Sequence, residues 1–250
     1  MTRDPNKEKK YFDEQIDFIE KAARKRFDDV EHFPNLNGRP GRAHDLVSYS
    51  LTNCVYRYSR GDAIESIRPA VWQWVEAKEI QQRVHTGLPP DLSNIRQMYE
   101  KLTLDTVYDA LTMLAFGAAL RFKKDEQARL IAAIGHQGED ALIDLAAKML
   151  GDTNRTISAS CKYPKIYQPL LDVWQAEPDQ RTAKLQAYAK DWKKKIKPIY
   201  WSNSLNGAEG AYFGYWCFEV ALTAMLLNID DQALQENPYY PKDLVQHYRA

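Results

Sequence analysis

The sequence contains little cysteine, no net charge and no long hydrophobic run. Only three of its 250 residues are cysteines, Cys54, Cys161 and Cys217, and they lie far apart. An odd, sparse set favours reduced, buried thiols of a cytosolic protein over a disulfide framework. The 34 basic residues balance the 34 acidic ones. The composition therefore gives no overall attraction to nucleic acid or to a membrane surface.

No segment predicts targeting to a membrane or passage across one. The N-terminus, MTRDPNKEKK, is charged and lacks the apolar core of a signal peptide. The uncharged run from Val220 to Ile229 is too short to span a bilayer. We therefore expect a soluble, cytoplasmic protein.

The common catalytic and metal-binding signatures are also missing. The sequence has no glycine-rich phosphate loop, no HExxH, no CxxC pair, no GxSxG and no EF-hand loop. Its five histidines are dispersed, without the spacing that places two ligands on one helix face. Glu76-Ala77-Lys78 has the E-x-K form of a nuclease motif, but it falls in a predicted helix, where the two side chains diverge. We expect a solvated face there, and no catalytic residue, metal or cofactor in the chain.

Hydrophobic periodicity predicts an all-α protein. Period-two alternation of β-branched residues is absent, whereas apolar residues recur at steps of three and four. Gly61 has the position of a left-handed helix cap, and Asp62 and Glu65 have capping-box spacing. We expect roughly ten helices in two sequential layers or lobes, 1–122 and 123–250. The predicted helices span about 6–31, 42–60, 63–84, 91–101, 104–121, 125–134, 139–150, 163–174, 179–196, 209–228 and a last one after Pro241.

The stretch from Tyr212 to Ile229 organises the second half. It is apolar nearly all the way round a helix, with Glu219 as its only charge, and so predicts an enclosed central helix over about 209–228. A buried carboxylate must be paired or hydrogen-bonded. Glu219, with Tyr215 and Trp216, is therefore expected to be a structural anchor; the alternative is a helical enzyme whose buried site holds Glu219, Tyr212 and Tyr215.

Two surface segments could meet a partner. The C-terminal stretch combines carboxylates with tyrosines, which could cover a positively charged site on another protein. Its candidate residues are Asp230, Asp231, Glu236, Tyr239, Tyr240 and Asp243. The basic run Lys190 to Lys197, with Trp192 inside it, could track a nucleic-acid backbone or could be a solvated helix end. We favour the solvated end and expect no direct nucleic-acid binding.

Several blocks resemble the PoNi family, the polymorphic-nuclease immunity proteins. The C-terminal blocks are Tyr212-Phe-Gly-Tyr-Trp-Cys-Phe-Glu-Val-Ala, Leu227-Asn-Ile-Asp-Asp231 and Tyr239-Tyr-Pro-Lys-Asp-Leu244, and the N-terminal block is Tyr56-Arg-Tyr-Ser-Arg-Gly-Asp62. Cys217 departs from the pattern, where a smaller residue is expected. The resemblance places an N-terminal PoNi region at 1–122 and a C-terminal one at 123–250.

The resemblance implies a non-catalytic helical protein that binds a cognate DNase toxin. Such a toxin is of the PD-(D/E)xK type and is often delivered by a type VI secretion system. The implied mechanism is occlusion of the DNA-binding groove or the active site. Because a nuclease groove is basic, the C-terminal carboxylates and tyrosines are the complementary candidates for toxin binding.

Overall fold

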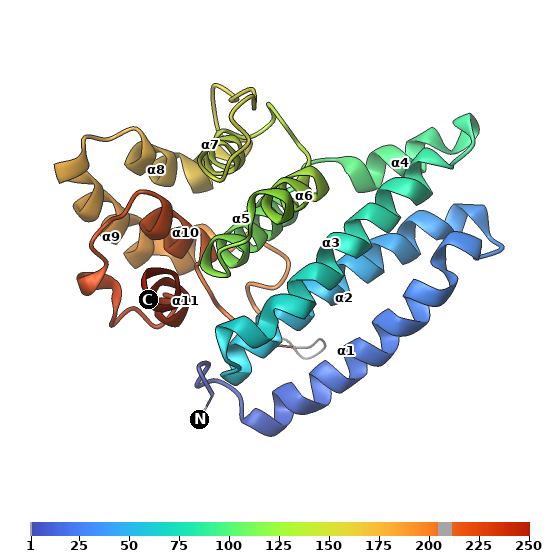
Figure 1. Ribbon diagram of the computed structural model, residues 1–250, viewed down its shortest axis with the longest axis horizontal. Coiled ribbons are helices and arrows are strands. Elements are labelled where there is room, and N and C mark those ends of the chain that lie inside the picture. Colours follow the sequence, from blue (N-terminus) through green and yellow to red (C-terminus); the bar gives the residue numbers. More distant parts are fainter. Residues whose placement is uncertain (1, 205–211) are drawn as a thin grey trace. The chain divides into compact units, whose positions relative to one another are not determined.

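The structure, a computed structural model, describes residues 2–204 and 212–250 (Figure 1). This part of the chain forms eleven α-helices and four short 3-10 helices, and it contains no strand. The predicted all-α class with roughly ten helices is therefore confirmed. None of the helices in 2–204 or 212–250 is both long enough and apolar enough to cross a membrane.

The chain divides into two compact units. The N-terminal unit spans Met1–Lys101 and the C-terminal unit spans Leu102–Ala250. The division falls one helix earlier than the expected limit at 122, because the helix over Leu104–Ala119 packs with the elements that follow it. The extents of the two family regions stay a prediction.

The N-terminal unit is a layer of three long helices with a short fourth. Helix α1 is Lys9–Asp29, α2 is Arg39–Arg60, α3 is Ile64–Thr86 and α4 is Ser93–Glu100. Helix α2 packs against both α1 and α3, which places it in the middle of the layer (Figure 1). Its buried face carries Leu46, Leu51 and Cys54, and α1 contributes Phe12 and Ile16. These are the positions that the period of 3.6 assigns to the core.

The turn between α2 and α3 combines a correct prediction with a wrong one. Gly61 has φ of 100° and ends α2 as a left-handed cap, as expected. Asp62 does not cap α3; the cap residue is Ala63, which offers no side-chain acceptor. The Asp62 carboxylate accepts hydrogen bonds from Arg57 and Arg60 instead. Two nearby guanidinium groups thus outcompete the backbone N–H groups of the first turn.

The C-terminal unit is built around two paired, buried helices. Helix α5, Leu104–Ala119, packs on α10, Phe218–Leu226, and also contacts α6, α7 and α11. Twelve of the sixteen residues of α5 are buried. The surrounding helices are α6 (Lys124–Ile134), α7 (Ala141–Met149), α8 (Pro164–Trp174), α9 (Pro178–Lys195) and α11 (Lys242–Arg249).

The predicted central helix over about 209–228 is too long. Residues 212–217 are not helical and α10 begins at Phe218, while 209–211 lie outside the described residues. Gly214 has φ of 104°, a value that an α-helix does not contain. The Cys217 N–H donates to the carbonyl of Tyr239, and the Tyr108 hydroxyl donates to the carbonyl of Trp216. These long-range partners satisfy backbone groups that a helix would have paired internally.

The three cysteines are free and buried, as predicted. Burial raises the pKa of Cys161 to about 12 and raises the pKa values of Cys54 and Cys217 as well. A thiol is nucleophilic only as the thiolate, so these cysteines act as small core residues.

Candidate functional site

Glu219 lies in the interior of the C-terminal unit, in the first turn of α10. Its side chain is 1% exposed. Oε1 accepts hydrogen bonds from the Trp192 indole N–H at 2.6 Å and from the Tyr188 hydroxyl at 3.2 Å. Both donors belong to α9, so the carboxylate ties α10 to α9. A Tyr hydroxyl from another helix is the kind of partner that the sequence predicts for an anchor.

The surroundings of Glu219 strongly disfavour its ionised form. Burial raises the pKa of Glu219 to about 7, although the bonds from Trp192 and Tyr188 act in the opposite direction. The other oxygen, Oε2, is buried and has no hydrogen-bond partner among the residues that the structure describes. The carboxyl is thus held by neutral donors alone, on one of its two oxygens.

The arrangement around Glu219 does not resemble a catalytic site. The titratable groups that sense its charge are Tyr108, Tyr167, Tyr188 and Cys217, whose pKa values are all raised by burial first and by Glu219 second. An acid–base pair needs two groups whose pKa values are driven apart, and a substrate needs access. Glu219 is enclosed and its neighbours are shifted in the same direction, so we interpret the cluster as an anchor. Within 2–204 and 212–250, no group of three or more His, Cys, Asp or Glu side chains is arranged to hold a metal ion.

Tyr215, one of the other two expected anchor residues, lies in an aromatic cluster with Trp201, Tyr212 and Tyr239. The Trp201 ring stacks on Phe213, with centroids 5.1 Å apart. Tyr215 is buried, and its ring meets those of Tyr212 and Tyr239 edge to face. Trp216 is buried too. The family-like blocks around 212–218 and 239 therefore meet in space, although about twenty residues separate them in sequence.

The structure divides the six expected toxin-binding residues into buried and accessible ones. Asp231 and Tyr240 are 5% and 3% exposed, so the expectation that they face a partner is corrected. The Tyr240 hydroxyl donates to Asp231 at 2.7 Å, and Arg249 also pairs with Asp231. This buried network holds α11 against the segment after α10.

The accessible members of that set form a smaller acidic surface. Asp230 and Glu236 are exposed, whereas Tyr239 and Asp243 are half-buried. Asp230 accepts a hydrogen bond from the Gln232 N–H at 3.0 Å, just before a short 3-10 helix, Gln232–Leu234, whose cap residue is Asp231. We call Asp230, Glu236, Tyr239 and Asp243 the C-terminal acidic surface.

In the basic run at the end of α9, Trp192 and Lys193 belong to the fold, whereas Lys190, Lys194 and Lys197 are exposed. Trp192 is fully buried and donates to Glu219, so its ring is not available to stack on a base. The Lys193 ammonium lies 3.0 Å from the centre of the Tyr215 ring and donates to the Ser202 carbonyl. Burial lowers the pKa of Lys193 to about 8. Trp192, the aromatic inside the run, is therefore a core residue and not a surface on which a base could stack.

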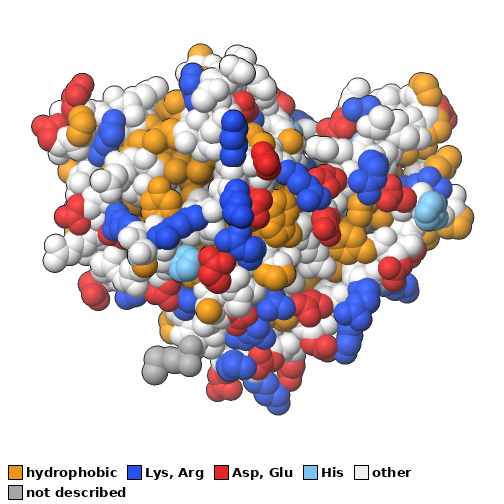
Figure 2. Space-filling view, viewed as in Figure 1, with side chains coloured by type: hydrophobic (Ala, Val, Ile, Leu, Met, Phe, Trp, Pro, Cys, Tyr) orange, Lys and Arg blue, Asp and Glu red, His pale blue; other side chains and the backbone are white. Residues whose placement is uncertain are grey.

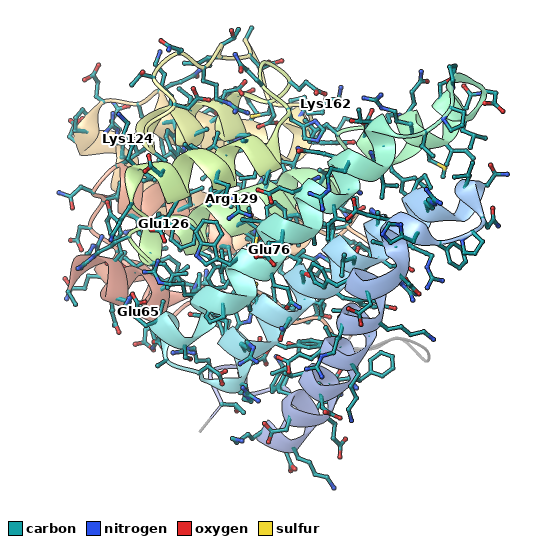
Figure 3. All side chains as sticks on the ribbon, turned by 45° about the vertical axis from the view of Figure 1, so that its right-hand side comes forward. Glu65, Glu76, Lys124, Glu126, Arg129 and Lys162 are labelled. Carbon is teal, nitrogen blue, oxygen red and sulfur yellow. The ribbon has the colours of Figure 1, made fainter. Side chains whose placement is uncertain are left out.

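A groove in the N-terminal unit is a feature that the sequence does not reveal. It has a volume of about 520 Å³ and lies over α2, between α1 and α3. Arg57, from the block Tyr56–Asp62, contributes to its floor. Glu76, which lies on α3 (Figure 3), is at its edge. Its lining residues are Glu20, Asn53, Arg57, Ser66, Pro69, Ala70, Trp72, Gln73 and Glu76.

Charge is finely mixed over the visible face of the molecule. Figure 2 shows Lys and Arg side chains interspersed with Asp and Glu, without a broad area of one sign. This agrees with the zero formal charge.

Part of the chain matches a known protein family. Residues 138–244 match the family described as "PoNe immunity proteins (PoNi), C-terminal". The match supports the PoNi resemblance of the sequence. The PoNi match covers α7 to α10 and reaches the first turn of α11, which includes Glu219 and the aromatic cluster. It leaves 1–137 outside, so the N-terminal PoNi region stays a prediction.

A solved structure shares the fold of this chain. "The Crystal Structure of Protein PA2201 from Pseudomonas aeruginosa" is similar with a TM-score of 0.72 and 19% sequence identity. The similarity covers 99% of this chain and 90% of that one. At this identity the likeness shows the fold alone. No curated protein matches the sequence significantly. The match over 138–244 implies a nuclease immunity protein.

Proposed function

We propose that this protein neutralises a DNase toxin by binding it. The toxin is a nuclease of the PD-(D/E)xK type delivered by a type VI secretion system, and the protein acts in the cytoplasm of the producing cell and its kin. Binding occludes the toxin's DNA-binding groove or its metal-dependent active site. The observation that carries the proposal is the PoNi match over 138–244.

The C-terminal acidic surface is the contact that we propose first. A nuclease must neutralise DNA phosphates with basic side chains, and exposed carboxylates beside a tyrosine complement such a surface. Asp230 and Glu236 supply exposed charge, and Tyr239 supplies an aromatic edge. Asp231 and Tyr240 lie beneath as support, because their polar atoms pair with each other and with Arg249.

The proposal also excludes catalysis by this chain. Glu219 is enclosed and bonded to Trp192 and Tyr188, which suits an anchor for α9 and α10. The protein should therefore bind the nuclease without changing it chemically. Mass spectrometry of the nuclease after incubation should show an unchanged mass.

The test uses the nuclease encoded beside this gene. Co-expression should protect cells from it, and the purified proteins should form a complex that blocks DNA cleavage. The variant Asp230→Asn/Glu236→Gln should weaken binding about tenfold at low salt, mainly through slower association. Asn at position 230 can still accept the hydrogen bond from the Gln232 N–H through its side-chain oxygen.

The matched control is Glu14→Gln/Asp17→Asn, which removes two exposed carboxylates from α1. It should bind as the wild type does. Absence of both a complex and protection in the wild-type pair would refute the proposed function. Equal binding by both double variants would refute the proposed contact only.

A further inference from the structure

The groove of the N-terminal unit has a polar floor that is already paired. Each of the three guanidinium nitrogens of Arg57 donates a hydrogen bond. Nε donates to Asn53 at 3.1 Å, Nη1 donates to Asp62 at 3.3 Å and Nη2 pairs with Glu20. The positive charge at the floor is therefore shared between two carboxylates. It offers little attraction to an anion.

The carboxylates of the groove, by contrast, keep free acceptor capacity. The Asn53 and Arg57 bonds to Glu20 both go to Oε1, and the Glu20 side chain is 38% exposed. Glu76 is exposed and makes no ion pair with any residue in the described ranges. The groove thus presents one partly used and one unused carboxylate, both in contact with solvent. Its local charge is negative, although the chain as a whole is neutral.

The remaining walls suit a long side chain with an apolar stem. Pro69 and Ala70 give aliphatic surface, Trp72 gives an aromatic face and Gln73 gives an amide. The volume of about 520 Å³ lies within the about 300–1,000 Å³ of clefts that take a ligand or a short segment of chain. An arginine uses all of these features together, because its guanidinium forks onto carboxylates and stacks on aromatic faces.

We propose that this groove receives a basic side chain, arginine above lysine, from the surface of the bound nuclease. The inference rests on the proposed function and adds a second contact, in the unit that lies outside the PoNi match. Glu76 supplies the unpaired charge, Glu20 supplies its free oxygen, and Trp72 packs on the side-chain stem. Arg57 holds Glu20 in place and makes no direct contact with the partner's charge.

The test compares variants of the full chain by calorimetric titration with the neighbouring nuclease, made inactive at its metal site. Glu76→Lys should weaken binding at least thirtyfold and Glu76→Gln about fivefold. The matched control Glu14→Lys, on the outer face of α1, should bind as the wild type does. Because Glu76 and Glu14 are both exposed, all three variants should unfold at the same temperature as the wild type. The loss of affinity caused by Glu76→Lys should become smaller at high salt, because salt screens a contact between charges.

The outcomes separate this inference from the proposed function. Wild-type affinity in Glu76→Lys, with a normal wild-type complex, would overturn the groove contact and leave the function intact. Tighter binding by Glu76→Lys would overturn it too, because the occupant would then be acidic. Loss of a dimer by Glu76→Lys in sedimentation of the chain alone would assign the groove to a second copy instead. If the wild type forms no complex with the nuclease, both the proposed function and the groove contact are refuted.

Discussion

The two units stabilise their charges in opposite ways. In the N-terminal unit, Arg60 lies at the corner between α2 and α3 and pairs with Asp13 and Asp62, and its side chain remains 19% exposed. In the C-terminal unit, the Asp144–Arg155 pair is almost completely enclosed, with side-chain exposures of 0% and 2%. Glu219 is enclosed as well, and only neutral groups bond to it.

The difference lies in what replaces water. At the corner between α2 and α3, both solvent and several opposite charges stabilise each charged group. Removing one partner should therefore lower the free energy of unfolding only modestly. In the interior, the protein must supply every hydrogen bond, because an uncompensated buried charge is very unfavourable. Asp144 illustrates this: besides Arg155, it accepts hydrogen bonds from the N–H groups of Gly138 and Ser158. The C-terminal unit should therefore tolerate the loss of one partner of an ion pair far less than the other unit.

The largest effect is expected for Arg155→Leu. It leaves Asp144 buried without its counter-charge and removes the bond from Arg155 to the Gly135 carbonyl. Breaking one side of a buried pair costs about 3–5 kcal/mol. Urea unfolding followed by circular dichroism should show this loss. The matched control is Arg83→Leu, which removes an exposed bidentate pair with Glu31 and should cost less than about 1 kcal/mol. Similar losses in the two variants would contradict the comparison.

A smaller, pH-dependent effect is expected for Glu219→Gln. The folded-state pKa of Glu219 is about 7, above the ordinary 4.5 of a glutamate, so folding favours the protonated form. This contribution is fully present below about pH 4.5 and is lost as pH rises toward 7; ionisation there costs the folded state about 3 kcal/mol. Gln keeps an acceptor oxygen for Trp192 and Tyr188 but cannot ionise.

The measurement is the urea midpoint of both proteins between pH 5 and pH 8. The advantage of Glu219→Gln over the wild type should grow with pH and level off above 7. Glu236→Gln, at an exposed position, serves as the control and should show a constant difference. A constant difference for Glu219→Gln would mean that the carboxyl is hydrated or paired, and that its anchor role needs no protonation.

Much of the helical framework could be predicted because local rules determine it. Apolar residues at a period of 3.6 identify α1 to α9 within a few residues, and a glycine after a helix identifies the left-handed cap at Gly61. The segment 212–217 could not be assigned in this way. Buried extended chain and buried helix are equally apolar, so periodicity does not separate them. The local sign in the sequence is the glycine at position 214, because glycine readily adopts the positive φ that the chain has there before α10.

The candidate site was harder to predict because its exposure depends on distant residues. Asp231 and Tyr240 lie in a polar stretch that is typical of a surface loop. They are buried in the structure, where Asp231 pairs with Arg249 and accepts a hydrogen bond from Tyr240. The groove depends on Glu20 and Glu76, which are on different helices and far apart in sequence. Neither residue has a local pattern that predicts a concave site. Only the packing of α2 between α1 and α3 brings them to one groove.

The smallest effect is expected for Arg60→Ala, and it differs from the others in its dependence on salt. The variant loses the pairs with Asp13 and Asp62, but Arg57 still bonds to Asp62. We expect a loss of about 1 kcal/mol. The loss should shrink when ionic strength is raised from about 0.1 M to about 1 M, because the Debye length falls from about 10 Å to about 3 Å.

Urea is the denaturant for this experiment, since guanidinium would itself screen the charges. The same salt series on Arg155→Leu is the decisive contrast. Its loss arises from the desolvation of Asp144, which mobile ions do not reach, so it should be nearly constant. If both losses fell in parallel with salt, Asp144 would be accessible to ions. The two units would then stabilise their charges in the same way.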